Sequence, residues 1–467
     1  MKIKLFIFAL LILSNYSCTK DLDFDLINQS LNTVNQNNNA EKSSFVPEKL
    51  AISVAEKFSV KSKTRNPNSN VKLNVKTIYG AKSNPLMYII NFSDNRFVII
   101  GATKNYYPIL AYSDKNSFSE KQKSGVTKWI KEIGTIIASS ENFNKKIKNQ
   151  MLSQWESYVQ SNDFCEKKAT RGMPEEDKVM HNRINELRNA YPDYDIRPLS
   201  TFSPSMFPIN GDIVSQELRD LATKFNSPIE YTICAVKREY SSKIVGPFLT
   251  TKWGQDYPYN ALLEDNLAGC VTIAMAQIMK YHKFPPQYNW DNMQDDAHTD
   301  NPQDLPKLIR DIAVAAKVKL GTSGSSSNIY KAKDAFCNIF NYSARIENYT
   351  LAQTQRELIK NKYPIYMRGE EDETGHAWVC DGTRQDKEEM FYFIECREGY
   401  PGKYSYRSID GPSPKFPGYA EQDHSPYFHM NWGWYGANDG WFRMNDVNPN
   451  TSNLSKNRKN LYVYPNR

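Results

Sequence analysis

A single cysteine, Cys270, stands between a glycine and an apolar run in the stretch "NLAGCVTIAMAQIMKYH", residues 266–282. Apolar residues recur at helical spacing from Val271 to Met279, which predicts a helix that begins at this cysteine. A helix start, together with a nearby imidazolium, lowers a thiol pKa from about 8.5 to as little as about 3.5. Gly269 lets the backbone turn sharply in front of the thiol. Taken alone, the stretch favours a buried structural thiol, so a nucleophile hypothesis needs partners elsewhere in the chain.

A nucleophilic thiol needs a general base, and the chain has six histidines. His282 lies on the predicted helix, twelve residues (282 − 270) and about 18 Å along its axis from Cys270, which is too far. His376 opens an expected strand in "TGHAWVCDG", where a glycine precedes it and apolar residues follow. We expect its ring at a sheet edge that faces the helix start. His429, two residues before Asn431, is the competing candidate.

Two further roles complete a thiol-dependent site. An Asn or Asp orients the imidazole by accepting from one ring nitrogen, so that the other nitrogen faces the sulfur. Asn431 in "HMNWGW" is the candidate, and Trp432 is placed to screen that hydrogen bond from water. An oxyanion hole needs two donors. The amide of Cys270 is one, and the side chain of Gln255, fifteen residues earlier (270 − 255), is the candidate for the second.

Four stretches occur in this order and together resemble the streptopain-like cysteine peptidases, a branch of the papain-like superfamily: "TKWGQ", "GCVTIAMAQIMKYHKFP", "GHAWVCDG" and "HMNWGWYGANDGWF". The segment "MYIINFSDNRFVIIGATKNYYPILAYS" resembles the inhibitory propeptide domain of that family. The resemblance covers roughly residues 45–115 and 245–450. It implies a role for each of five residues: Cys270 as nucleophile, His376 as general base, Gln255 as oxyanion donor, and Asn431 with Trp432 as the histidine-orienting pair.

The chain departs from the family pattern in two places. The segment 120–240 is longer than a simple propeptide requires, which leaves its role and the maturation cleavage site open. The residues after Cys270 are larger than family members often carry, a change that affects packing more than chemistry.

His376 follows Cys270 by 106 residues (376 − 270), whereas papain-type enzymes place the histidine roughly 130–150 residues downstream. Local papain signatures therefore do not transfer.

The elements around these motifs predict an α+β fold, with a papain-like peptidase domain of helices followed by antiparallel sheet, behind a smaller α+β propeptide domain. In the smaller domain, Leu86–Phe92 and Phe97–Ile100 are joined by turn-forming residues 93–95 and predict a hairpin. The later stretches "HAWVCDGTRQDKEEMFYFIEC" and "YFHMNWGWYGANDGWFRM" are also expected to form β-hairpins with Gly, Asp and Asn turns.

The expected division of the chain has four parts. In order, they are a lipoprotein-type signal peptide (1–18), a flexible tether (19–45), the inhibitory propeptide domain with its linker (46–240) and the streptopain-like peptidase domain (241–467).

The N-terminus predicts export. Lys2 and Lys4 precede the apolar run at residues 5–13, which is typical of a short secretory signal and too short for a membrane span. Cys18 stands close behind and resembles the lipidated cysteine of a bacterial lipoprotein signal, although Asn15 departs from that pattern. Two destinations stay open: an outer-membrane lipoprotein, periplasmic or at the cell surface, that is anchored through Cys18, or a secreted protein in which this cysteine is incidental.

Composition excludes several classes of protein. With 467 residues, 40% hydrophobic and 13% aromatic, the chain can bury a sizeable core in two or three domains. The net charge of +7 comes from 59 basic and 52 acidic residues spread along the chain, so nucleic acid is not an expected partner. The six cysteines after Cys18 form no CxxC pair, which argues against a zinc site and a dense disulfide framework. No metal or organic cofactor is expected.

Three functions stay open at the level of sequence. The first is an endopeptidase made as a zymogen, which hydrolyses protein or peptide substrates through a Cys-His thioester and has its own propeptide as intramolecular inhibitor. The second is a catalytically inert, peptide-binding surface lipoprotein on a peptidase fold. Its weakness is that a binding module has no need of Cys, His, Asn and Gln together. The third is another cysteine hydrolase, such as a cell-wall amidase or a transglutaminase-like enzyme. The loop 397–426 either shapes specificity or is an ordinary insertion.

Overall fold

The computed structural model describes residues 44–61, 73–80, 83–119, 125–159, 174–202, 204–207, 211–296, 304–322, 324–371, 374–409, 418–444 and 458–467. The predicted signal peptide, Cys18 and almost all of the predicted tether lie outside these residues. Within them, no helix has both the length and the apolar character needed to cross a membrane.

The N-terminal domain is a four-stranded antiparallel sheet covered by helices. Its main elements, in chain order, are α2 (Glu48–Lys61), β1 (Leu73–Tyr79), β2 (Pro85–Phe92), β3 (Arg96–Gly101), β4 (Ile109–Ser113), α3 (Gly125–Ser139), η2 (Ser140–Asn142) and α4 (Lys145–Val159). The predicted hairpin is confirmed, because β2 and β3 pair with Phe92 opposite Arg96. Along β2, Tyr88 and Ile90 pack with α2, whereas Met87 and Ile89 pack with α3. Both faces of the strand are buried, which explains its uninterrupted apolar sequence.

The C-terminal part begins with helices that pack on the sheet. These are α7 (Cys270–His282), η6 (Trp290–Asn292), α8 (Asp304–Ala315), α9 (Ile329–Asn338) and α10 (Leu351–Lys360). The helix predicted to start at Cys270 is confirmed as α7. All of its residues from Cys270 to Met279 are buried, not only the predicted apolar face. The reason is that α7 lies between the sheet on one side and α8 and α9 on the other.

Apart from β7, which precedes α10, the strands of this part follow the helices, and the predicted α+β class is confirmed. They are β7 (Tyr342–Asn348), β8 (Ile365–Glu371), β9 (Thr374–Glu398), β12 (Tyr427–Asn431), β13 (Gly440–Arg443) and β14 (Arg458–Pro465). The second predicted hairpin is confirmed, with Met430 of β12 opposite Gly440 of β13. The first is wrong, because β9 is a single strand of 25 residues. Its polar middle does not turn, since that stretch is paired on both edges along much of its length.

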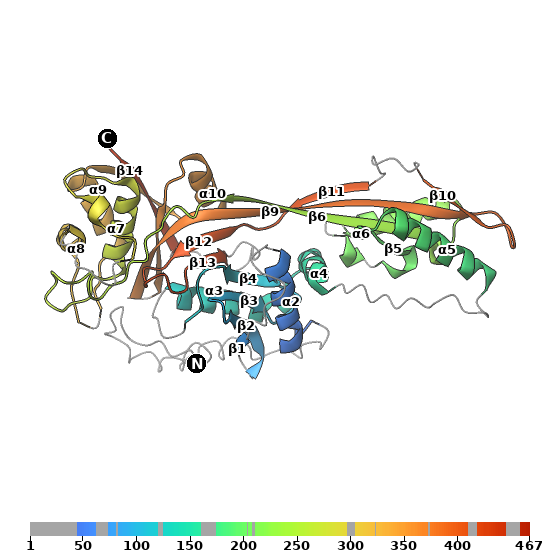
Figure 1. Ribbon diagram of the computed structural model, residues 1–467, viewed down its shortest axis with the longest axis horizontal. Coiled ribbons are helices and arrows are strands. Elements are labelled where there is room, and N and C mark those ends of the chain that lie inside the picture. The colour runs from blue at the N-terminus through green and yellow to red at the C-terminus, as the bar shows by residue number, and fades with distance from the viewer. Residues whose placement is uncertain are drawn as a thin grey trace, which may run out of the picture.

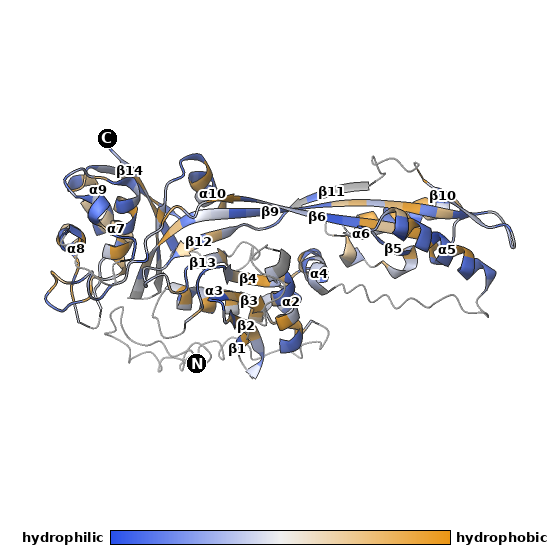
Figure 2. Cartoon of the chain, viewed as in Figure 1, coloured by the Kyte–Doolittle hydropathy of each residue, from blue (hydrophilic) through white to orange (hydrophobic). Residues whose placement is uncertain are grey.

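A third body, which we call the ribbon lobe, is built on the far end of β9 (Figure 1). Its elements are α5 (Glu175–Ala190), β5 (Asp195–Pro198), η3 (Leu199–Thr201), η4 (Pro204–Met206), α6 (Gly211–Lys224), η5 (Ile229–Tyr231), β6 (Ile233–Val245), β10 (Ser405–Ser408) and β11 (Gly418–Asp423). Strand β6 pairs with β9 along its whole length, from Ile233 opposite Glu395 to Val245 opposite Thr383. Figure 2 shows apolar colouring where helices cover this ribbon and hydrophilic colouring along β6 beyond them.

The ribbon lobe has its own small cores on both faces of the ribbon. Cys234 and Val236 of β6 pack on the side of α6, whereas Ile233 and Ala235 pack on the side of α5. This alternation follows from the two-residue period of a strand. Residues 174–245 are therefore joined to the C-terminal part of the chain by sheet pairing and by shared cores.

The sheet is continuous from the N-terminal domain to the C-terminus. The strand order is β1-β2-β3-β4-β13-β12-β9-β8-β14-β7, and β6, β10 and β11 also pair with β9. The two parts meet where β4 pairs with β13, with Ala111 opposite Phe442. This junction brings the N-terminal domain beside the strand that carries Asn431.

Candidate active site

Cys270 is the first residue of α7, at the position where a nucleophile is expected. Gly269 precedes it with a φ of 83°, in the region that favours glycine, and a Cβ at Gly269 would lie 2.9 Å from the Cβ of Ser325. The thiol is 3% exposed. Amides in the first turn of a helix have no partner within the helix, and their partial positive charge favours a thiolate. Glycine is thus required at position 269 by its positive φ and by the close approach of Ser325.

Gln255 is tied to the turn in front of Cys270. Its carbonyl oxygen accepts from the amide of Ala268 at 2.8 Å, two residues before the thiol. The side chain of Gln255 is 0% exposed, and within the described residues neither its Oε1 nor its Nε2 has a hydrogen-bond partner. Leaving a buried amide unpaired costs about 1–3 kcal/mol. Such a group suits a donor that is kept in place for an oxygen of a substrate.

The segment that carries Gln255 is held rigidly, which explains the motif "TKWGQ". The indole of Trp253 is fully buried and donates to the carbonyl of Gln294 at 2.8 Å. A side chain at Gly254 would overlap the ring of Tyr435. The tryptophan therefore anchors the segment, and the glycine allows Tyr435 to pack over it.

His376 lies on β9, opposite Gly369 of β8. Its ring stacks on Trp378, two residues along the same face of the strand, with centroids 6.1 Å apart and an interplanar angle of 13°. Trp378 in turn contacts Trp432, with ring centroids 5.2 Å apart. The predicted general base, on β9, and the predicted screening tryptophan, directly after β12, thus belong to one aromatic group.

Asn431, the last residue of β12, is buried, and both polar atoms of its side chain are hydrogen-bonded. Its Oδ1 accepts from Nε2 of Gln277 and from the amide of Gly433, both at 3.1 Å. Its Nδ2 donates to the carbonyl oxygen of Thr251 at 2.8 Å. Within the described part of the chain, His376 is not among the hydrogen-bond partners of Asn431. The predicted orienting role of Asn431 therefore stays a prediction, and it requires a change from this arrangement.

The competing histidine, His429, belongs to a separate buried cluster. Its Nδ1 lies 2.6 Å from Oδ1 of Asp381. Burial by itself lowers the pKa of His429, but the charge and hydrogen bond of Asp381 outweigh it and raise that pKa. Nearby, Asp439 accepts from the amide of Trp432 at 2.8 Å, and burial raises the pKa of Asp439 to about 7. This cluster supports the backbone of Trp432 from behind.

The remaining histidine on α7 and the strand cysteines are poorly suited to this chemistry. Burial lowers the pKa of His282 to about 4, and its ring lies edge-on to Tyr363 with centroids 4.6 Å apart. Burial raises the pKa of Cys380, and it raises that of Cys396 to about 11. These three groups are neutral core residues near pH 7. No group of three or more His, Cys, Asp or Glu in the described residues could hold a metal ion.

The N-terminal domain touches the aromatic group directly. A Cβ at Gly125, the first residue of α3, would lie 2.6 Å from Cζ3 of Trp432 and 2.8 Å from Cδ2 of His376. Close by, the amide of Ser119 donates to Oδ1 of Asn438 at 2.7 Å, and Nδ2 of Asn438 donates back to Ser119 at 3.0 Å. The helix α3 therefore covers the side of the site that carries His376 and Trp432.

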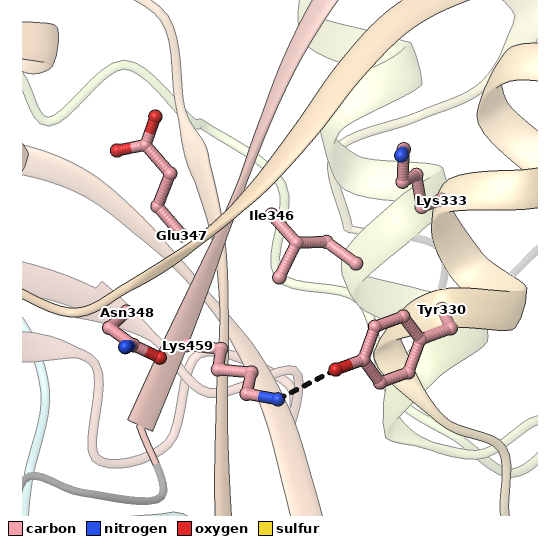
Figure 3. A pocket seen from close by; sticks show the side chains of 6 residues that line it. All are labelled: Tyr330, Lys333, Ile346, Glu347, Asn348 and Lys459. Carbon is pink, nitrogen blue, oxygen red and sulfur yellow. Dashed lines mark hydrogen bonds between the residues drawn. The ribbon is translucent and has the colours of Figure 1, made fainter.

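A surface hollow of about 390 Å³ lies elsewhere, between α9 and strands β7 and β14 (Figure 3). Its rim carries the amine of Lys459, which donates to the hydroxyl of Tyr330 at 2.8 Å. None of the five predicted site residues lines it.

Hydrogen bonds thus link Gln255 and Asn431 to residues close to Cys270 in the chain, and Trp378 links the rings of His376 and Trp432. Gln255 is linked to the turn before Cys270, and Asn431 is linked to α7 through Gln277. Sequence reasoning missed the role of Gln277, although its spacing of seven residues from Cys270 (277 − 270) places it on the same face of the helix. Its polar character within an apolar run was the available signal.

Two protein families match the chain. Residues 253–287 and 286–442 match the Peptidase C10 family, and residues 43–137 match the Spi protease inhibitor family. Residues 138–252, which include α4 and much of the ribbon lobe, lie between the two matches.

Curated relatives are proteases by name. Streptopain from Streptococcus pyogenes is 20% identical over 427 residues, which cover 81% of this chain and 79% of streptopain. Thiol protease/hemagglutinin PrtT from Porphyromonas gingivalis is 24% identical over 241 residues, which cover 42% of this chain and only 23% of PrtT. A solved structure of a prointerpain A fragment from Prevotella intermedia aligns with 15% identity and a TM-score of 0.42, covering 85% of this chain and all of the fragment.

Proposed function

We propose that this chain, a streptopain-like member of the Peptidase C10 family with an N-terminal inhibitor domain, is a cysteine endopeptidase made as an inactive precursor. The observation that carries the proposal is the buried side-chain amide of Gln255, which lacks a partner among the described residues. The backbone carbonyl of the same residue accepts from Ala268 in the turn before Cys270. An inert binding module would gain stability by losing this unpaired group. A peptidase needs it for the oxyanion of each tetrahedral intermediate.

The proposed reaction uses only groups of this chain. The thiolate of Cys270 attacks the carbonyl carbon of the scissile bond, and the oxyanion accepts from the amide of Cys270 and from Nε2 of Gln255. His376, as imidazolium, protonates the leaving amine, so that the C–N bond breaks and a thioester remains. His376 then takes a proton from water, whose oxygen attacks the thioester and releases the acid and the thiolate.

Inhibition in the precursor is supported by the contacts of the N-terminal domain. Gly125 lies against His376 and Trp432, and β4 continues the sheet beside β13. In this arrangement Oδ1 of Asn431 accepts from Gln277 and Gly433, and His376 is not among its hydrogen-bond partners in the described residues. We propose that removal of the domain allows the imidazole ring to reach Oδ1 of Asn431.

We place the boundary of the inhibitory domain between α4 and α5 instead of near residue 240. Helix α4 contributes Met151 and Trp155 to the cores of the N-terminal domain. The lobe that follows shares cores with β9 and pairs with it over thirteen residues of β6. A cut between the two helices would therefore leave the ribbon lobe on the mature peptidase.

The proposal includes export, with protein or peptide substrates outside the cytoplasm. The apolar run at residues 5–13 supports a secretory signal, and Cys18 is the proposed site of lipidation. Comparing fatty-acid labelling of wild type with Cys18→Ala tests the anchor. Equal labelling of the two proteins would exclude it and leave a secreted protein.

The experiment that tests the function incubates the full chain, Cys270→Ala and the control Cys337→Ala, and maps the termini of all fragments. Cys337 is a free thiol on α9 and has no proposed role. We expect wild type and Cys337→Ala to cut themselves and a denatured protein substrate, whereas Cys270→Ala does neither. Undiminished activity in Cys270→Ala would refute the mechanism. Hydrolysis of peptidoglycan alone would point to a cell-wall amidase, and no hydrolysis with stoichiometric peptide binding would point to the inert module.

A further inference from the structure

Three buried side chains join the segments that carry the predicted site residues. Gln277 lies about two turns along α7 from Cys270 and is 0% exposed. Its Oε1 accepts from the hydroxyl of Thr251 at 2.8 Å, and its Nε2 donates to Oδ1 of Asn431 at 3.1 Å. Asn431 donates from Nδ2 to the carbonyl oxygen of Thr251 at 2.8 Å. The ring of hydrogen bonds therefore connects the segment before Gln255, helix α7 and strand β12.

Backbone groups fix the orientation of both amides. Nδ2 of Asn431 faces a carbonyl oxygen, which can only accept, and Oδ1 faces the amide of Gly433, which can only donate. Gln277 must then present Nε2 to Asn431 and Oε1 to Thr251. A glutamate at position 277 would face Asn431 oxygen to oxygen, and an apolar residue would leave buried polar groups without a partner.

We propose that Gln277 is a positioning residue of the peptidase site, which sets where Asn431 presents its carbonyl oxygen to His376. This inference rests on the proposed function. Oδ1 of Asn431 has two lone pairs, and Gln277 and Gly433 use both of them. His376 therefore gains this oxygen only by sharing it with these two donors, which hold it in place. The glutamine thus acts on the imidazole through Asn431 and does not touch substrate.

The same ring couples Gln277 to the oxyanion side of the site. Thr251 lies four residues before Gln255 (255 − 251), on a segment that Trp253 anchors. Thr251 is bound by Gln277 through its hydroxyl and by Asn431 through its carbonyl. Loss of Gln277 is therefore expected to disturb the chemical step more than substrate binding.

The test compares Gln277→Met, Asn431→Ala and the double variant as full chains, matured by immobilised wild-type enzyme that is then removed. Methionine keeps the length and approximate volume of glutamine without its hydrogen bonds. We expect kcat to fall about 10- to 100-fold in Gln277→Met with KM nearly unchanged, since small misplacements of reacting groups cost about that much. In the Asn431→Ala background, Gln277→Met is expected to cause little further loss of kcat, because Gln277 acts on His376 through Asn431.

A matched control and a second variant complete the design. Gln355→Met removes a helix glutamine that donates to Gln385 at 2.8 Å, and is expected to leave kcat unchanged. Thr251→Val removes only the hydroxyl that holds Oε1 of Gln277, and is expected to lower kcat in the same direction by a smaller factor. The pH profile of the rate at which iodoacetamide alkylates Cys270 should be displaced along the pH axis in Gln277→Met and unchanged in Gln355→Met.

Each result of these experiments either supports or overturns the positioning role of Gln277. Normal kcat in Gln277→Met, or losses that add fully with Asn431→Ala, would overturn the positioning role while leaving the peptidase assignment intact. If Gln277→Met does not fold, an unchanged kcat in Thr251→Val overturns it. If wild type cleaves no peptide, the proposed function fails and the positioning role falls with it.

Discussion

Replacing Gly125 by valine is expected to activate the full-length precursor before any bond in the chain is cut. Gly125 begins α3 and lies against the rings of Trp432 and His376, where a Cβ would approach to 2.6 and 2.8 Å. Carbon atoms in ordinary contact lie about 3.5–4.0 Å apart. The first added carbon therefore overlaps both rings by about 1 Å.

The rings have little room to retreat. Trp432 is 2% exposed and packs against Trp378 and Phe442, with ring centroids 5.2 and 5.3 Å away. Overpacking of this kind costs about 1–3 kcal/mol. At about 1.4 kcal/mol per factor of ten, the docking equilibrium of α3 moves about 5- to 150-fold toward the released state.

The assay is hydrolysis of a fluorogenic peptide by the intact precursor, followed on a gel until the first cut appears. Thr135→Val is the control, because the hydroxyl of Thr135 bonds to the carbonyl of Lys131 within the same helix. After maturation, Gly125→Val and wild type should be equally active, since the proposed cut between α4 and α5 removes Gly125 with the inhibitory domain. A precursor of Gly125→Val that is as inactive as wild type, with hydrogen exchange of α3 unchanged, would refute the reasoning.

Three further predictions concern single groups of the site. Gln255→Met should raise the melting temperature, because a buried unpaired amide is removed. It should also lower kcat by about 100- to 1,000-fold, because an oxyanion donor is lost. A lower melting temperature with normal kcat would contradict both expectations. Burial raises the pKa of Asp439 from 3.8 to about 7, so the folded state holds a proton that the unfolded chain lacks, and stability falls as pH rises from about 4 to 7. Asp439→Asn keeps the acceptor for Trp432 and should remove this pH dependence, so that the loss of unfolding free energy between pH 5 and pH 8, measured with urea, becomes smaller by about 3 kcal/mol at most. Iodoacetamide at pH 6 should modify Cys270 of the mature enzyme and spare Cys380 and Cys396, as read by mass spectrometry, because burial raises the pKa of both strand thiols.

Local patterns in the sequence were sufficient for the elements that depend on neighbouring residues. The start of α7 after Gly269 follows from a glycine and a helical apolar repeat, and the β2–β3 hairpin follows from two apolar runs around Ser93-Asp94-Asn95. Both signals act within a few residues. The same reasoning failed for β9, whose polar middle resembles a turn until β6, from far earlier in the chain, pairs along it. Pairing between distant segments leaves no local periodicity that could reveal it.

Residue types and their order predict the chemical groups of the site: one thiol at a helix start, a histidine on a later strand, a glutamine before the helix and an asparagine near the end. The contacts that these groups make depend on the tertiary structure. Gln277 satisfies Asn431, Gly125 lies against the rings of His376 and Trp432, and the amide of Gln255 is buried. The physical reason is that residue type fixes what a side chain can donate or accept, whereas its partner is fixed by packing between segments that are remote in sequence.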